Sequence, residues 1–311
     1  MHEQRTGSPR RTLVVMAAGL GARYGGLKQL ERLGPSGETL LDYSVFDAMR
    51  AGFNRVVFVI RRDFETAFRS TFGDTIATQV DVRYAFQDEF LPDGLVARSR
   101  PWGTGHAILS ASNSIEGPFG VVNADDFYGA ASFSLLSQAL DSAACGSNLI
   151  AFRLANTLSE HGPVKRGVCQ VDSEGFLIGI EEYENITRSK EGFVSADAST
   201  GSHQLTGEDL VSMNMWGFQE SFIDAAREVF LEFVQREGQS LTTEFFLPTI
   251  VDHLMKSGGI RCRVIETQSK WFGLTYTQDK PGAVRVLHTL HRMGEYPVPL
   301  WPGSTPPGRF R

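Results

Sequence analysis

The sequence contains few cysteines, no long apolar run and no excess of basic residues. Its three cysteines, Cys145, Cys169 and Cys262, lie far apart, so we expect buried thiols rather than a disulfide framework or a zinc knuckle. No segment approaches the roughly twenty apolar residues that a membrane-spanning helix requires. Thirty Lys and Arg against 36 Asp and Glu give a net charge of −6, which excludes a general attraction to nucleic acid or to an anionic membrane.

The N-terminal region has one feature of a secretory leader. Arg10 and Arg11 precede the apolar stretch 13–18, but this stretch is short and continues directly into a glycine-rich segment that carries two more cations. We therefore expect a cytoplasmic protein. Residues 1–11 are polar and basic and residues 294–311 are rich in Pro and Gly, so we expect both to be flexible tails.

The full chain has the composition of a folded protein, with 41% hydrophobic and 21% charged residues, and we place its folded body at residues 12–293. Apolar strand-like runs alternate with helical patterns, which predicts one α/β domain with a mostly parallel, Rossmann-like sheet flanked by helices. Strands are predicted near 13–18, 56–60, 82–86, 119–123, 148–152 and 211–218, and helices near 41–49, 104–113, 132–144 and 221–235.

Residues 167–182 interrupt this alternation. Two short apolar runs, 168–171 and 176–180, flank Asp172-Ser173-Glu174-Gly175, and this pattern predicts a β-hairpin insertion. The polar and weakly periodic stretch 185–209 is expected to form a loop or flap.

A glycine-rich loop follows the first predicted strand. Four glycines lie between residues 19 and 26, at the carboxyl edge of a parallel sheet, where open α/β sheets bind ligands. Backbone amides freed by the glycines can bind phosphate oxygens, and Arg23 and Lys28 add cationic donors within the same few residues. The loop therefore predicts a polyphosphate site, because an ordinary glycine turn does not need two cations.

Two familiar phosphate-binding motifs do not fit this loop. A dinucleotide fingerprint needs a third glycine where Ala22 stands and an acid at a strand end about twenty residues on, whereas Asp42 falls in a helical pattern. A Walker loop needs Ser or Thr after Lys28, and Gln29 stands there.

The loop, Met16-Ala17-Ala18-Gly19-Leu20-Gly21-Ala22-Arg23 with Lys28 beyond it, resembles the signature of the sugar-nucleotide pyrophosphorylases. These nucleotidyltransferases join a nucleoside triphosphate to a sugar 1-phosphate. The resemblance implies a GT-A-type sheet and catalytic roles for Arg23 and Lys28, which would neutralise phosphate charge. It also implies that the nucleotide is bound by the loop residues Ala17, Ala18, Gly19 and Gly21.

A second motif, Trp102-Gly103-Thr104-Gly105-His106-Ala107, opens a predicted helix after Gln87 ends a strand. By itself it indicates no more than a helix cap at Thr104. The resemblance implies that Gln87, Gly103 and Thr104 bind the base, and the motif resembles the form found in uridylyltransferases. UTP is therefore favoured over dTTP, and His106 is expected to pack within the protein or face solvent.

Two acids, Asp125 and Asp126, follow the predicted strand 119–123. Carboxylates that face a triphosphate would repel it unless a cation intervenes, so we expect Mg²⁺, which takes one or two carboxylates together with phosphate oxygens. The resemblance implies that Asp125 is the metal ligand and a catalytic residue. The alternative is that the two acids cap the following turn.

The same resemblance, through weaker motif matches, implies which residues contact the sugar. Gly167, Glu182 and Asn214 would contact it, with Glu181 and Ser212 as register alternatives.

The chain departs from the family pattern at two positions. Tyr183 stands where many relatives have a lysine for the sugar phosphate, and Lys165, Arg166 and Lys270 are candidate replacements. Gly273 stands where relatives often have a second metal-binding acid, for which Asp279 is a distant candidate.

The predicted function is transfer of a nucleoside monophosphate, favouring UMP, from a triphosphate to a sugar 1-phosphate with release of pyrophosphate. An anionic acceptor phosphate needs no general base, so catalysis would consist of positioning and charge neutralisation. Cytidylyl transfer to a small alcohol phosphate such as phosphocholine, and non-catalytic nucleotide-sugar binding, are the alternatives. A glycosyltransferase fits less well, because Asp125-Asp126 is not an Asp-x-Asp motif. The sugar is left open, and the sequence is compatible with a homo-oligomer.

Overall fold

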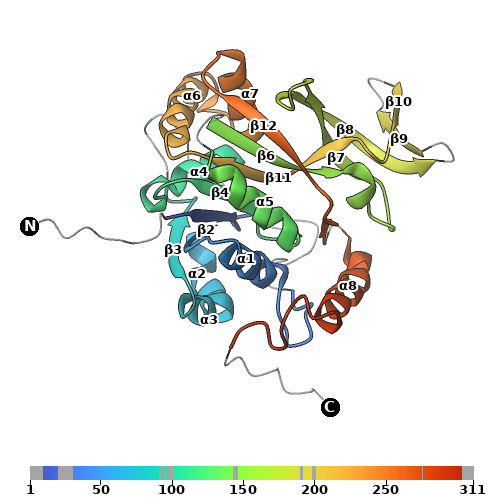
Figure 1. Ribbon diagram of the computed structural model, residues 1–311. Helices are drawn as coiled ribbons and strands as arrows, with labels where there is room; N and C mark the ends of the chain where they lie inside the picture. The colour runs from blue at the N-terminus through green and yellow to red at the C-terminus, as the bar shows by residue number, and fades with distance from the viewer. Residues whose placement is uncertain are drawn as a thin grey trace, which may run out of the picture.

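The computed structural model describes residues 10–19, 31–90, 93, 96, 101–142, 146–189, 192–197, 201–274 and 276–302. A large sheet with helices on both faces forms the centre of the molecule (Figure 1). The α/β class expected from the sequence is confirmed. None of the described helices has the length and apolar character needed to cross a membrane.

Eleven strands of the described residues form this sheet, in the order β10-β9-β8-β7-β11-β4-β1-β2-β3, with β6 between β11 and β12. Strands β1, β2, β3 and β4 are parallel, as are β6 and β12, whereas β11 runs antiparallel to β4, β6 and β7. The strands are β1 (Thr12–Met16), β2 (Arg55–Ile60), β3 (Asp81–Phe86), β4 (Phe119–Asn123), β6 (Gly146–Arg153), β7 (Val164–Val171), β8 (Leu177–Ser189), β9 (Gly192–Asp197), β10 (Gly201–Leu205), β11 (Leu210–Phe218) and β12 (Arg261–Thr267). A separate small ladder pairs β5 (Asp126–Phe127) with β13 (Phe272–Gly273).

Two apolar cores lie on opposite faces of the sheet. The helices are α1 (Leu40–Arg50), α2 (Glu65–Phe68), α3 (Asp74–Ala77), α4 (Thr104–Ser110), α5 (Ala130–Leu140), α6 (Phe222–Glu237), α7 (Leu247–Lys256) and α8 (Lys280–Arg292). Side chains of α1, α5 and α8 belong to one core, and those of α4, α6 and α7 to the other. Strands β1, β2 and β4 are buried on both sides, which explains their near-continuous apolar sequence.

The predicted hairpin is present, and its tip is held by Asp172. The Asp172 carboxylate accepts hydrogen bonds from the backbone N–H groups of Glu174 and Phe176, at 2.9 and 2.8 Å. The expectation of a loop over 185–209 is wrong, because β8 continues to Ser189 and β9 and β10 extend the ribbon from it (Figure 1). Three apolar residues of this stretch are buried, and Val194 is partly buried, while the many polar residues hide the strand period; the buried ones are Ile186, Phe193 and Leu205.

The C-terminal segment is also more ordered than its composition suggests. Residues 294–302 were expected to lie in a flexible tail, yet Tyr296, Leu300 and Trp301 are buried against α1 and the loop before it. The Tyr296 hydroxyl donates to Asp47 Oδ2 at 2.7 Å, and Trp301 Nε1 donates to Asp42 Oδ1 at 2.9 Å. Residues 294–302 therefore pack against the body of the protein, because acids about 250 residues earlier supply acceptors that no local pattern reveals.

The buried carboxyl of Asp47 links stability to pH. Burial raises the pKa of Asp47 to about 7, although the hydrogen bond from Tyr296 and the charge of Arg50 lower it in part. The unfolded chain loses this proton near the ordinary pKa of about 3.9, so stability falls as pH rises from roughly 4 to 7. Asn at this position stays neutral and keeps an oxygen acceptor for Tyr296.

Asp47→Asn is therefore expected to raise the free energy of unfolding at pH 8 by about 1 kcal/mol or more, and to change it little at pH 3.5. Urea denaturation across this pH range measures the difference. The exposed Asp224→Asn is the control, and an Asp47→Asn effect of equal size at both pH values would contradict the assignment.

Candidate functional site

The carboxyl ends of three parallel strands bring the main sequence-predicted residues to one edge of the sheet. Ala17 and Ala18 are buried just after β1, and Ala17 N–H donates to the Val59 carbonyl of β2 at 2.8 Å. Gln87 follows β3, with its N–H on the Ile60 carbonyl, and Asp125 follows β4. Gly19 is exposed at the same edge. The remaining loop residues predicted for this site, Gly21, Arg23 and Lys28, lie outside the described residues.

The side chain of Gln87 is oriented by two neighbours. Its Nε2 lies 2.9 Å from the Gly103 carbonyl oxygen and 3.3 Å from Nδ1 of His106. His106 Nε2 lies 2.7 Å from the Phe90 carbonyl oxygen, which only accepts, so Nε2 carries the proton and Nδ1 of the neutral ring accepts from Gln87. Both amide hydrogens of Gln87 are thereby engaged, which leaves Oε1 as the acceptor atom of this side chain. His106 is fully buried, so its expected packing within the protein is confirmed.

The turn that leads into α4 packs against the backbone of Phe245. Gly103 has φ +101°, and a Cβ there would lie 2.7 Å from the Phe245 carbonyl oxygen, so only glycine fits. The Thr104 hydroxyl accepts a hydrogen bond from Leu247 N–H at 2.9 Å, at the start of α7. Thr104 thus caps a neighbouring helix, which makes it part of the frame that places Gly103.

Asp126 is buried at the centre of a hydrogen-bonded network after β4. Its Oδ2 accepts from Asn123 Nδ2 at 2.8 Å and from the Tyr128 hydroxyl at 3.3 Å. Asn214 Nδ2 donates to Asn123 Oδ1 at 3.0 Å, and Asn214 Oδ1 accepts from Trp216 Nε1 at 2.9 Å. The structure therefore brings Asn214 next to the predicted metal-site acids.

Asn214 has a backbone φ of 63°, in the left-handed region, and the pairing of β11 with β6 shifts register between Ser212 and Trp216. Asn tolerates this conformation better than most residues. The bulge turns the Asn214 amide towards the end of β4.

Asp126 also explains the glycine at position 273. Residue 273 pairs with Asp126 across the β5–β13 ladder, and a Cβ at Gly273 would lie 2.6 Å from Asp126 Oδ1. A side chain there would require this buried, hydrogen-bonded carboxylate to move. The carboxylates at this edge that could hold a cation are Asp125, which is partly exposed, and Asp126, and Mg²⁺ typically takes one or two carboxylates together with phosphate oxygens. Among the residues described, no cluster of three or more His, Cys, Asp or Glu is present.

The predicted sugar contacts on the hairpin face each other. Gly167 of β7 pairs with Glu182 of β8, and a Cβ at Gly167 would lie 3.0 Å from Glu182 Oε1. Glu182 is exposed, with Lys165 Nζ 3.8 Å from its Oε2. The neighbouring rung pairs Arg166 with Tyr183, so the arginine lies directly across from the position that lacks the expected lysine.

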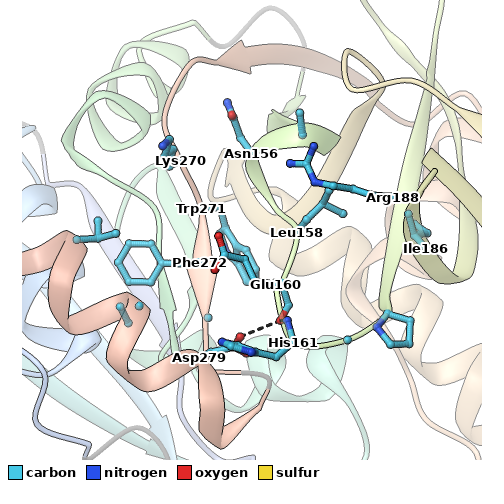
Figure 2. Close-up of a pocket in the computed structure, with 18 of the residues that line it drawn as sticks. Asn156, Leu158, Glu160, His161, Ile186, Arg188, Lys270, Trp271, Phe272 and Asp279 are labelled. Carbon is cyan, nitrogen blue, oxygen red and sulfur yellow. Dashed lines mark hydrogen bonds between the residues drawn. The ribbon is translucent and has the colours of Figure 1, made fainter. Parts of the chain in front are cut away.

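A cavity of about 770 Å³ lies beside these residues, between α8, the segment 155–163 and β8. Figure 2 shows Trp271 and Phe272 on the segment that crosses it, with Arg188 on the opposite side. Arg166, Lys270 and Gly273 line it as well. Asp279, the distant candidate for a metal ligand, also lines it, but accepts hydrogen bonds from Ser159 Oγ and Tyr276 N–H, both at 2.8 Å.

Several residues of this site were not found from the sequence. Asn123 and Tyr128 hold Asp126 and were not singled out, although an Asn at the carboxyl end of a buried strand is a signal for such a role. Trp271 was not singled out either, and its ring stacks on the buried Arg166 guanidinium, with 4.8 Å from Cζ to the ring centroid. These contacts join segments far apart in sequence.

Comparisons with known proteins agree with the geometry. The sequence model of the family described as Nucleotidyl transferase matches residues 13–246. No curated protein matches the chain. The inositol-1-phosphate CTP transferase of T. maritima has a similar structure, with a TM-score of 0.61, 14% identity, and coverage of 90% of this chain and 96% of that one. A UDP-glucose pyrophosphorylase solved with UDP-glucose has a TM-score of 0.57 and 16% identity, with 89% and 98% covered.

At these identities the solved structures establish a shared fold and nothing finer. The family match covers well over half of the chain, including β1, β3 and β4 and the residues that follow them. The chain therefore belongs to the nucleotidyl transferase family, as its glycine-rich loop predicts.

Proposed function

We propose that the protein transfers UMP from UTP to a sugar 1-phosphate, forming a nucleotide sugar and releasing pyrophosphate. The observation that carries this proposal is the position of Ala17, Ala18 and Gly19, which follow β1, at the same sheet edge as the Asp125–Asp126 pair, with a large cavity nearby. Two structural relatives, named as a CTP transferase for inositol 1-phosphate and a UDP-glucose pyrophosphorylase, support a phosphate monoester as the acceptor.

Gln87 supports a uracil or thymine base. Its amide hydrogens are held by Gly103 and His106, so Oε1 is available to accept from the imide N–H of the base. Cytosine presents an acceptor at the same ring position and would be repelled there. Gly103 and Thr104 lie beside Gln87 and would complete the base site. This arrangement favours UTP and dTTP over CTP.

Mg²⁺ is the cation that the donor set suits, with Asp125 as its proposed ligand and Asp126 beside it. When bound, such an ion would supply charge stabilisation for the reacting phosphates. The buried network of Asn123, Tyr128 and Asn214 holds the Asp126 carboxylate in one orientation before substrates arrive.

The proposed reaction is an in-line displacement. An acceptor phosphate oxygen forms a bond to the α-phosphorus as the bond to the pyrophosphate oxygen breaks, and pyrophosphate leaves. Backbone of Ala17, Ala18, Gly19 and Gly21 would hold the triphosphate, while Arg23 and Lys28 carry charge on the transferring and leaving groups. Gly167, Glu182 and Asn214 would hold the sugar.

Asp125→Asn is expected to lower pyrophosphate release from UTP and a sugar 1-phosphate by about 10²-fold, because the site loses a negative ligand where charge develops. A screen of sugar 1-phosphates and small alcohol phosphates, each with UTP, dTTP and CTP, finds the acceptor first. Asp141→Asn, far from the site, is the control. Mn²⁺ binding in the presence of UTP, followed by electron paramagnetic resonance, must weaken in the same variant.

Wild-type protein that releases no pyrophosphate with any pair would refute the proposal. It would favour nucleotide-sugar binding without catalysis. Turnover restricted to CTP and a non-sugar acceptor would replace it with cytidylyl transfer.

His106→Leu tests the orientation of Gln87. Without the imidazole acceptor the Gln87 amide can rotate, so the preference for UTP over CTP in kcat/KM should fall about tenfold, or about 1.4 kcal/mol of discrimination. Ser110→Ala, on the same helix, is the matched control. An unchanged UTP/CTP ratio in a normally folded His106→Leu protein would remove His106 from the base site.

A further inference from the structure

The cavity beside α8 carries more positive than negative charge, in a chain whose net charge is −6. Among the described residues, none of its four cationic side chains forms an ion pair, and these are Arg166, Arg188, Lys270 and Arg285. Its two carboxylates are Glu160 and Asp279, and Asp279 is already bonded to Ser159 and Tyr276. The cavity wall thus carries four cationic side chains that form no ion pair with a described carboxylate.

Arg166 is the unusual member of this set, because it is only 9% exposed. The comparable buried arginine, Arg55, is 4% exposed and pairs with Asp81 at 2.8 Å and Glu116 at 2.7 Å. Arg166 instead donates one N–H from each of its three guanidinium nitrogens, from Nε and Nη2 to Thr157 and from Nη1 to the Lys165 carbonyl, so one N–H on each Nη remains. A buried cation without a carboxylate partner is costly and is usually matched by a ligand or a counter-ion.

A second orphaned group belongs to the same wall. Trp271 is 8% exposed, and its indole Nε1 is buried without a hydrogen-bond acceptor in the described part of the chain. Its ring stacks on Arg166, so an unused N–H and a guanidinium with N–H groups to spare lie together. A buried donor without a partner costs free energy unless a ligand or water accepts from it.

The position of Arg166 relates this wall to the proposed reaction. Burial lowers the pKa of Arg166 to about 10, and the carboxylates of Asp126 and Glu182 raise it in part, so the guanidinium lies within electrostatic reach of both. Gly273 lines the cavity and also pairs with Asp126. The cavity therefore adjoins the proposed metal site on one side and the proposed sugar contacts on the other.

We propose that this cavity is the acceptor site, and that Arg166 and the Trp271 indole N–H bind the phosphate of the acceptor. The inference rests on the proposed function for the identity of the acceptor, but the anion site itself does not. A phosphate monoester supplies acceptor oxygens for both orphaned donors and negative charge for the guanidinium. Arg166 thereby takes the part of the lysine that is absent at Tyr183, from the opposite strand of the hairpin.

The test is calorimetric titration of the nucleotide-free protein with inorganic phosphate and with glucose 1-phosphate. Arg166→Lys keeps the charge but loses the planar set of donors, and Trp271→Phe keeps the stacked ring but loses the N–H. Each is expected to weaken phosphate binding at least tenfold. Trp271→Phe should leave thermal stability unchanged or higher, because it removes an unsatisfied buried donor.

Matched controls use the same substitutions elsewhere. Arg55→Lys alters a buried arginine that is already ion-paired, and Trp301→Phe alters an indole that already donates to Asp42. Both should lose stability and keep phosphate affinity. UTP affinity should stay within twofold in all variants, since a parallel loss for UTP would assign Arg166 to the nucleotide phosphates instead.

Phosphate affinity within twofold of wild type in folded Arg166→Lys and Trp271→Phe would overturn the inference, even if wild-type protein releases pyrophosphate. Loss of phosphate binding in both variants, with no turnover of any substrate pair by wild-type protein, would leave the anion site standing and refute only the proposed function.

Discussion

The burial of the Asp126 carboxylate is the constraint on which the rest of the site depends. A buried carboxylate must have hydrogen-bond donors, and Asn123 and Tyr128 supply them from its own strand end. Asn123 in turn is bonded by Asn214, whose left-handed backbone bends β11 towards β4. The other oxygen of the carboxylate fills the space beside Gly273, so no side chain can enter from the crossing strand.

The buried positive charge of Arg166 is constrained in the same way, because a buried guanidinium needs acceptors or a counter-charge. Arg166 is buried on the neighbouring hairpin, near Asp126 and Glu182 but in contact with neither as an ion pair among the described residues. The electrostatic effect of acids at a distance offsets only part of its burial. An acidic chain thus concentrates an anion-attracting wall beside its acidic pair, which is the arrangement that a metal-dependent phosphate chemistry would use.

Local sequence patterns predicted the elements that are governed by local physics. The parallel strands β1, β2 and β4 are apolar because both faces are buried, and their near-continuous apolar runs are visible in the sequence. The end of β8 and strands β9 and β10 were not predicted, because this stretch is mostly polar and only scattered residues such as Ile186 are buried. The burial of Trp301 depends on Asp42, so no window of sequence contains the reason for it.

The sequence by itself determined the family, the α/β class and the position of Asp125 and Gln87 at strand ends, because these follow from short motifs and hydrophobic periodicity. Only the tertiary structure decided that His106 orients Gln87, that Asp126 excludes a side chain at Gly273, and that Arg166 lies buried without a carboxylate partner in the described chain. The reason is physical: hydrogen bonding, exclusion and desolvation depend on which distant segments the fold brings together, and sequence spacing does not specify them.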